Sequence, residues 1–192
     1  MNKKTILGIA VIALMAIVAV AGCGKKDGTS EGSGSRTVAV KYDPESDFEA
    51  RAIDGGKGVE ITKYVGDKWE VNIPPTIRDI PVTNIGEGAF RNKSLISVTI
   101  PNSVTTLEWG AFSNNQLTKV IIPNSVTTIG GRAFEDNQLT WVTIGANVRI
   151  PNEYIHFAFK DSGFDEDYTV NYNRAAGTYT RSDTTIQSWR KH

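Results

Sequence analysis

The chain has 192 residues, of which 40% are hydrophobic and 22% are charged, so it is long enough for one globular domain with its own core. Its 21 basic and 21 acidic side chains cancel and are mixed along the sequence. No basic patch of the kind that binds DNA or RNA results, and we expect no nucleic-acid partner.

Residues 1–22 have the layout of a bacterial secretion signal. Lys3 and Lys4 precede an unbroken apolar run over residues 5–20, and two small residues follow it. The run is nearly long enough to cross a bilayer, so a retained membrane helix is the alternative. Residues 20–23, VAGC, resemble the lipobox of bacterial lipoproteins. That resemblance implies removal of the signal and attachment of the mature chain to a membrane through lipid on Cys23.

Residues 23–37 are predicted to be the lipidated cysteine followed by a flexible tether, because residues 24–37 contain no large apolar side chain. Lys25 and Lys26 are interpreted as part of a solvated linker, with contact to anionic lipids as the alternative. Cys23 is the sole cysteine, so we expect no disulfide. In some bacteria an Asp after the lipidated cysteine marks inner-membrane retention. Gly24 stands there instead, which favours the outer membrane or cell surface.

Residues 38–68 are expected to form an N-terminal cap for the repeats that follow them. Residues 47–65 alternate between apolar and polar on either side of the Gly-rich segment GGKG, which predicts a β-hairpin. A stack of repeats exposes apolar faces at its two ends, and such a hairpin would cover the first of them.

Residues 69–147 are predicted to be repeats, with a period of 22 residues from Leu95 onward and a degenerate earlier copy that contains an insertion after Pro74. LISVTIPNSVTTLEWGAFSNNQ begins at Leu95, LTKVIIPNSVTTIGGRAFEDNQ begins at Leu117, and a third copy begins at Leu139. A fixed period of this length is typical of a solenoid in which each turn stacks on the next. The LxxVxI segments have the alternation and the β-branched residues of short strands, which Pro101 and Pro123 end.

Apolar positions that recur in every copy are predicted to point inward and stack on their equivalents. These are Val104, Leu107, Ala111, Phe112, Val126, Ile129, Ala133 and Phe134. Phe90, Phe112 and Phe134 are expected to form an aromatic spine. The Ser and Thr residues of the repeated SVTT are interpreted as turn residues that hydrogen-bond their own backbone.

The segment IPNSVTTIGGRAF followed by NQLTKVIIP resembles the BspA-like class of leucine-rich repeat over roughly residues 59–147. Family members commonly carry Cys after AF, where this chain has polar residues. The word NNQLT and the tail YNRAAGTYTRSDTTIQSW are similar to treponemal leucine-rich repeat lipoproteins in particular. The resemblance implies a curved right-handed solenoid with short parallel strands on its concave face. It also implies surface-exposed binding or adhesion.

After Ile144 the repeat spacing is lost, so residues 148–192 are predicted to be a C-terminal cap and tail.

The histidine and cysteine residues that catalysis often uses are scarce in this chain. A Ser/His/Asp triad would need His156, which is interpreted as a structural histidine within YIHFAF. The acidic segment 161–168 invites a calcium hypothesis, but its spacing is not that of a calcium loop, and a solvated loop is favoured. We expect no enzyme activity, no metal and no cofactor.

A binding surface is predicted at the strand positions whose residue type differs from one repeat to the next, while the buried positions recur. Val98 and Ile100 are expected to be buried, like their equivalents in the other repeats. Alternate strand residues face outward, so the concave face should display Ser97, Thr99, Lys119, Ile121, Trp141 and Thr143. Ile121 and Trp141 are diagonal neighbours there and form a candidate contact patch. The alternatives are an exposed pair without function, or a patch that the C-terminal tail covers. Trp109 is a second candidate contact, or it packs on the loop beside it.

These features predict a protein partner, either extracellular or in the cell envelope. The main hypothesis is a lipid-anchored adhesion-like module on the cell surface. The alternative is a periplasm-facing lipoprotein that assembles with other envelope proteins.

Overall fold

The computed structural model describes residues 40–146, 148–150, 158–159, 164, 174–182, 184 and 188–192. The chain divides into two units, Met1–Val38 and Ala39–His192, and every described residue belongs to the second. The predicted signal, Cys23 and the tether therefore lie outside the described residues, as do His156 and all the acidic residues of segment 161–168. Within the part that is described, no helix is long and apolar enough to cross a membrane.

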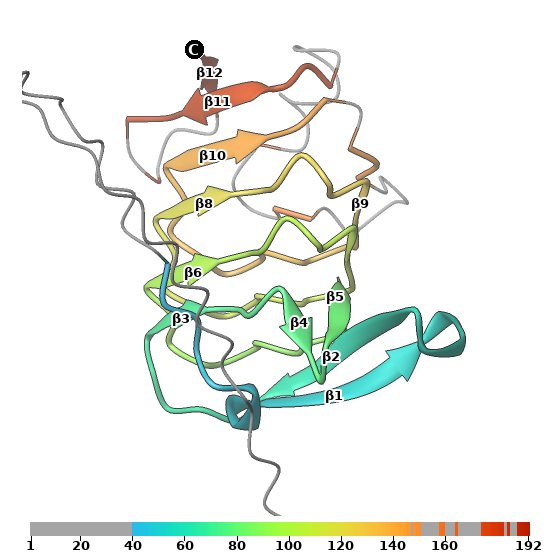
Figure 1. The fold of residues 1–192 in the computed structure, drawn as a ribbon. Helices are drawn as coiled ribbons and strands as arrows, with labels where there is room; N and C mark the ends of the chain where they lie inside the picture. Colours follow the sequence, from blue (N-terminus) through green and yellow to red (C-terminus); the bar gives the residue numbers. More distant parts are fainter. Residues whose placement is uncertain are drawn as a thin grey trace, which may run out of the picture. The chain divides into compact units, whose positions relative to one another are not determined.

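The second unit is a β-solenoid whose turns place short strands on two walls (Figure 1). The first wall contains β3 (Glu70–Asn72), β6 (Ser97–Thr99), β8 (Lys119–Ile121) and β10 (Trp141–Ile144). These strands come from the LxxVxI segments, and β3 pairs with β6, and β8 with β10, in parallel. The solenoid that the period predicts is confirmed, and so are the short parallel strands that the family resemblance implies.

The second wall contains β5 (Ile80–Ile85), β7 (Thr106–Leu107) and β9 (Thr128–Ile129), which pair in parallel and in that order. The second Thr of each repeated TT therefore begins a strand and is not only a turn residue. The hydroxyls of Thr105 and Thr127 donate to the carbonyl oxygens of Thr83 and Thr105, at 3.2 and 3.3 Å. Each bond joins one turn to the turn before it, so the interpretation that these threonines bond their own backbone is wrong.

The core runs along the interior of the solenoid, and all eight recurring residues predicted to point inward are buried. The rings of Phe90 and Phe112 stack with centroids 5.0 Å apart, and those of Phe112 and Phe134 with centroids 5.4 Å apart. The predicted spine is thus confirmed. It also extends beyond the prediction, since Tyr64 stacks on Phe90 and Phe159 stacks on Phe134.

A ladder of asparagine side chains accompanies the spine and was not predicted. The Nδ2 group of buried Asn115 donates to three carbonyl oxygens, those of Phe90, Phe112 and Ser113. Its Oδ1 atom accepts the backbone N–H groups of Lys93 and Leu95. Asn137 repeats this arrangement one turn later, on Phe112, Phe134, Glu135 and Leu117. These amides satisfy backbone groups that the tight turn would otherwise leave buried without a partner.

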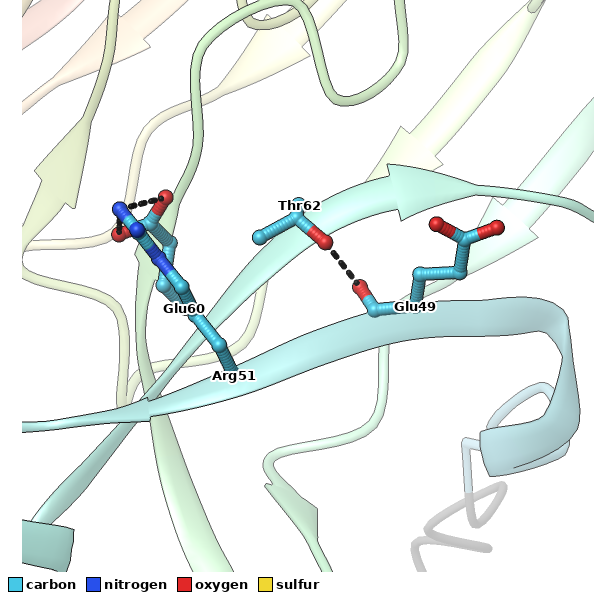
Figure 2. A network of polar contacts seen from close by, with 4 residues as sticks. All are labelled: Glu49, Arg51, Glu60 and Thr62. Atoms are coloured by element: carbon cyan, nitrogen blue, oxygen red, sulfur yellow. Dashed lines mark hydrogen bonds and ion pairs between the residues drawn. The ribbon is translucent and has the colours of Figure 1, made fainter.

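The predicted N-terminal hairpin is present, with β1 (Phe48–Ile53) antiparallel to β2 (Gly58–Tyr64). Figure 2 shows its polar face, where Arg51 donates to both carboxylate oxygens of Glu60 and Thr62 donates to the carbonyl oxygen of Glu49. Strand β2 continues the second wall by pairing in parallel with β5. The shorter elements are η1 (Glu45–Asp47), η2 (Asp54–Gly56) and β4 (Thr76–Ile77), and β4 pairs antiparallel with β5. That the β1–β2 hairpin caps the solenoid stays a prediction.

The C-terminal segment extends the first wall through β11 (Gly177–Thr180), which pairs antiparallel with β10, and β12 (Arg190–Lys191), which pairs with β11 (Figure 1). The ring of Phe164 packs edge-on against Tyr179 and Trp189, with centroids 5.4 and 5.2 Å away. Among the described residues after Ile144, aromatic packing therefore replaces the regular repeat. Closure of this end by residues 148–192 stays a prediction.

Candidate binding surface on the first wall

The outer face of the first wall carries the residues that vary between repeats. The structure places all six predicted contact residues there: Ser97, Thr99, Lys119, Ile121 and Trp141 are exposed, and Thr143 is half-buried. The parallel register pairs Lys119 with Trp141 and Ile121 with Thr143. Ile121 and Trp141 are therefore diagonal neighbours, as the 22-residue period predicts.

Trp141 is held in place by contacts on two sides. The Lys119 ammonium lies 4.8 Å from the centroid of its indole ring, a cation–π geometry. The indole Nε1–H donates to Thr143 Oγ1 at 3.3 Å, and that hydroxyl shares a 3.0 Å hydrogen bond with Thr178 of β11. The contribution of Thr178 was not predicted. It depends on β11 pairing with β10, and the period carries no information about that pairing.

The described part of the C-terminal segment lies at the edge of the first wall and does not cover its face. Strand β11 pairs along β10, and Trp141 and Ile121 keep 41% and 54% of their surface exposed. Among the described residues, the C-terminal strands leave this patch open; its coverage by the rest of the tail stays an alternative.

The C-terminal strands lengthen the row of side chains that begins at Lys119. Trp141 is paired with Thr180, and Thr180 with Arg190, so the four lie side by side across β8, β10, β11 and β12. Paired residues on adjacent strands face the same side, which places one cation on each side of Trp141. An exposed aromatic ring between Lys119 and Arg190 suits a partner that presents carboxylates.

Two further apolar side chains lie exposed at the start of first-wall strands. Trp69 directly precedes β3 with 65% of its surface exposed, and Ile96 directly precedes β6 with 44% exposed. Both occupy the same position of their repeats, yet the sequence reasoning missed them because it considered only the alternating strand residues. With Ile121 and Trp141, they give this wall an exposed apolar residue in each of its four turns.

A groove of about 460 Å³ is lined by residues of β6, β8 and the positions beside them. Its walls include Ile96, Val98 and Ile100 on one side and Lys119, Ile121 and Pro123 on the other. Val98 is only partly buried, whereas its equivalents Val71, Val120 and Val142 are fully buried. The expectation that Val98 is buried like its equivalents is therefore wrong, because its strand does not close against β8.

Trp109 lies away from this surface, two residues after the end of β7. It is half-buried, and the guanidinium carbon of Arg132 lies 5.3 Å from the centroid of its ring. This packing on the neighbouring turn favours a structural role over a second contact point.

The described residues contain no group of three or more His, Cys, Asp or Glu side chains that could hold a metal ion.

The repeats themselves match a known family. A model of the BspA type leucine rich repeat region matches residues 70–164 as six copies. This repeat region belongs to the BspA type of leucine-rich repeat.

Three solved structures resemble this chain over part of its length. The leucine-rich repeat protein of T. pallidum is 22% identical over 50% of this chain and 67% of its own, with a TM-score of 0.37. A leucine-rich cell surface protein from Faecalibacterium prausnitzii is 17% identical over 55% of each chain, with a TM-score of 0.26. A leucine-rich repeat protein from Bacteroides ovatus is 21% identical, with a TM-score of 0.29. The match covers 52% of this chain and 41% of the Bacteroides ovatus chain. No curated protein matches the sequence.

Proposed function

We propose that this chain is a lipid-anchored, extracytoplasmic protein that binds another protein through the outer face of its first wall and catalyses no reaction. Proteins built from leucine-rich repeats are typically protein–protein interaction modules. The observation that carries the proposal is the exposed Trp141, fixed between Lys119 and Thr143 and diagonal to Ile121.

Physical arguments support this surface over the rest of the described molecule. Aromatic residues surrounded by polar groups dominate the binding energy of protein interfaces. A side chain that is already oriented loses less conformational freedom on binding, so a fixed Trp141 binds more tightly than a mobile one. The described strands β5, β7 and β9 of the second wall carry no exposed aromatic side chain.

Partner capture tests the surface. The full chain, held in detergent micelles, is used as bait for cell-surface and envelope proteins, beside the double variant Trp141→Ala, Ile121→Ser and the control Glu87→Ala. Glu87 is exposed outside both walls, so its removal should change nothing. We expect one partner to be retained by the parent and the control and lost by the double variant. Equal recovery of the partner by all three proteins would show that the first wall is not the binding surface.

Lipid attachment and location are tested separately. Metabolic labelling with an alkyne fatty acid should label the parent and not Cys23→Ser. Protease added to intact cells should then digest the domain if it faces outward, as the adhesion-like role requires. Survival of the domain in intact cells, with digestion only after the outer membrane is opened, would instead establish the alternative of a periplasm-facing assembly protein.

A further inference from the structure

The sheet of the second wall ends in a long strand edge. Strand β1 pairs with β2 alone, so its other side has no strand partner among the described residues (Figure 1). It is six residues long, Phe48–Ile53, whereas the other described strands that lack a partner on one side are two or three residues long. An unpaired edge of this length is a template for another strand.

The shorter edges offer less to a partner. Asp43 occupies the edge of β3, where its N–H and carboxylate bond the C=O and N–H of Asn72 at 2.9 and 2.8 Å. No ladder forms across the break between β6 and β8. The turns that carry these two strands nevertheless bond each other directly, for example from Gln116 N–H to Leu95 C=O at 2.8 Å. The edge of β12 consists of two cationic residues, so it would repel a second copy of itself.

Strand alternation identifies the main-chain groups on the open side of β1. The carbonyl oxygen of Glu49 accepts the Thr62 hydroxyl of β2 at 3.2 Å, so the main-chain groups of Glu49 point toward β2. The shift of register after Glu49 leaves Thr62 as the extra residue, so the bulge lies in β2 and β1 keeps its regular alternation. Successive residues of a strand point to opposite neighbours, which directs the main-chain groups of Phe48, Ala50 and Ala52 away from β2.

The pairing of β2 with β5 agrees with this direction. Ile61 lies opposite Ala50, and its carbonyl oxygen accepts Gly86 N–H at 2.8 Å on the side of β5. Phe48 N–H donates to a carbonyl oxygen of η1. Among the described residues, no hydrogen bond engages the Phe48 C=O or either main-chain group of Ala50 and Ala52. These five groups form the open edge.

Two charges of opposite sign flank the middle of this edge. Glu49 and Arg51 are exposed and lie two residues apart, so their side chains share one face of β1 (Figure 2). Both bonds from Arg51 to Glu60 come from Nη2, so Nη1 and Nε can donate to a second carboxylate. Glu49 makes no ion pair among the described residues.

The sign of these charges selects one antiparallel register for two copies of β1. A ladder centred on Ala50 places Ala50 opposite Ala50 and Glu49 opposite Arg51, twice, which are favourable cross-strand pairs. A ladder centred on Glu49 or on Arg51 places two like charges opposite each other, which is unfavourable. Centres farther along the strand pair fewer residues. The edge is therefore complementary to itself in the register with the most extensive favourable pairing.

We propose that two copies of this chain associate through β1, in a two-fold symmetric antiparallel ladder centred on Ala50. Each Ala50 N–H donates to the Ala50 C=O of the other copy, and each Ala52 N–H donates to the Phe48 C=O of the other copy. The inference goes beyond the proposed function and does not depend on it, because it uses the other wall. A dimer of this kind presents two first walls to a multivalent partner.

Disulfide cross-linking from single cysteines tests the register. In the proposed ladder the Cα atoms of the two Ala50 residues are about 5.5 Å apart, within the range for a disulfide, and those of the two Ala52 residues are about 14 Å apart. The full-length variants Ala50→Cys and Ala52→Cys keep every charge of β1 and are oxidised in intact cells, with the parent as the background from Cys23. We expect position 50 to give at least about ten times as much covalent dimer as position 52. An equal or smaller yield from position 50, or no covalent dimer from either, would overturn the proposal.

Co-capture of two differently tagged full-length copies from detergent-solubilised cells tests the charges. Glu49→Arg in both copies, or Arg51→Glu in both copies, should lower co-capture at least about fivefold, because like charges then face each other. One copy of each variant should restore it, since opposite charges again face each other, and Glu87→Ala in both copies should match the parent. Equal co-capture in every combination, or no recovery in the mixed pair, would overturn the charge-selected ladder.

Discussion

Lys119 and Trp141 lie 22 residues apart and at the same level of two parallel strands, with the ammonium 4.8 Å from the centroid of the indole ring. The repeat period places the two residues at equivalent positions of adjacent turns. Because the repeats differ at this position, a cation lies beside an aromatic ring. The pair is exposed, so its contribution to folding is small, on the order of 0.5–1 kcal/mol. Its main consequence is the orientation of Trp141 at the centre of the candidate surface.

Lys119→Ala should therefore separate binding from stability. The free energy of unfolding in urea should fall by less than about 1 kcal/mol, because only an exposed cation–π contact is lost. Partner binding should weaken several-fold, because Trp141 loses its orientation and the row loses a cation. A binding titration that gave the parent affinity would show that the pair is not part of the interface.

Phe112 lies at the centre of the aromatic spine, stacked on Phe90 and Phe134. Phe112→Ala should lower the free energy of unfolding by about 3–5 kcal/mol, because it leaves a cavity between two stacked turns. Urea denaturation followed by circular dichroism measures the change, with Glu87→Ala as the exposed control. Coinciding curves for Phe112→Ala and the parent would contradict the assignment of the spine to the core.

Asn115 satisfies five buried or partly buried backbone groups through one amide. Asn115→Ala should cost about 2–4 kcal/mol of stability, since several of these groups lose their partner and water reaches them poorly. Gln116→Ala, at the exposed neighbouring position, should cost less than about 0.5 kcal/mol. Similar costs for the two variants would show that the amide ladder does not stabilise the turn.

Stability should fall at high pH through Tyr64 and Lys68. Burial raises the pKa of the Tyr64 hydroxyl above 10.0, and the hydrogen bond to the Asp43 carboxylate raises the pKa of the Lys68 ammonium above 10.5. In both cases the folded state holds its proton more tightly than the unfolded state. The stabilisation is therefore fully present below about pH 10 and is lost as pH rises through the folded-state pKa values.

Tyr64→Phe tests this pH dependence, because it removes one of the two groups while keeping the ring that stacks on Phe90. Unfolding free energies measured from pH 8 to pH 12 should decline less steeply for the variant than for the parent. Identical declines would mean that Tyr64 does not titrate differently in the two states.

Much of the fold could be predicted because the repeat gives two constraints, the 22-residue period and the alternation of residues within each strand segment. A 22-residue period places equivalent residues above one another, so a correct assignment of Phe112 as inward also assigns Phe90 and Phe134. Alternation within LxxVxI then determines that Lys119 and Trp141 face outward. The N-terminal hairpin could be predicted in the same way, from alternation on both sides of a Gly-rich turn.

Features that depend on interactions outside the period could not be predicted. Asn115 and Asn137 recur at the same position of consecutive repeats, but only the geometry of the turn shows that their side-chain amides point inward. Pairing of β11 with β10 joins segments of unrelated sequence. The break between β6 and β8 occurs between two nearly identical repeats, so it arises from how the turns stack and not from a local signal.

Photo-crosslinking from two single positions tests the central claim, that the first wall is the binding surface, most directly. A benzophenone amino acid is placed at Ile121 on the first wall or at Thr127, an exposed residue beside the second wall, in the full chain on intact cells. We predict that light produces one discrete adduct with a partner protein from position 121 and none from position 127. An adduct from position 127 alone, or the same adduct from both positions, would contradict binding through the first wall.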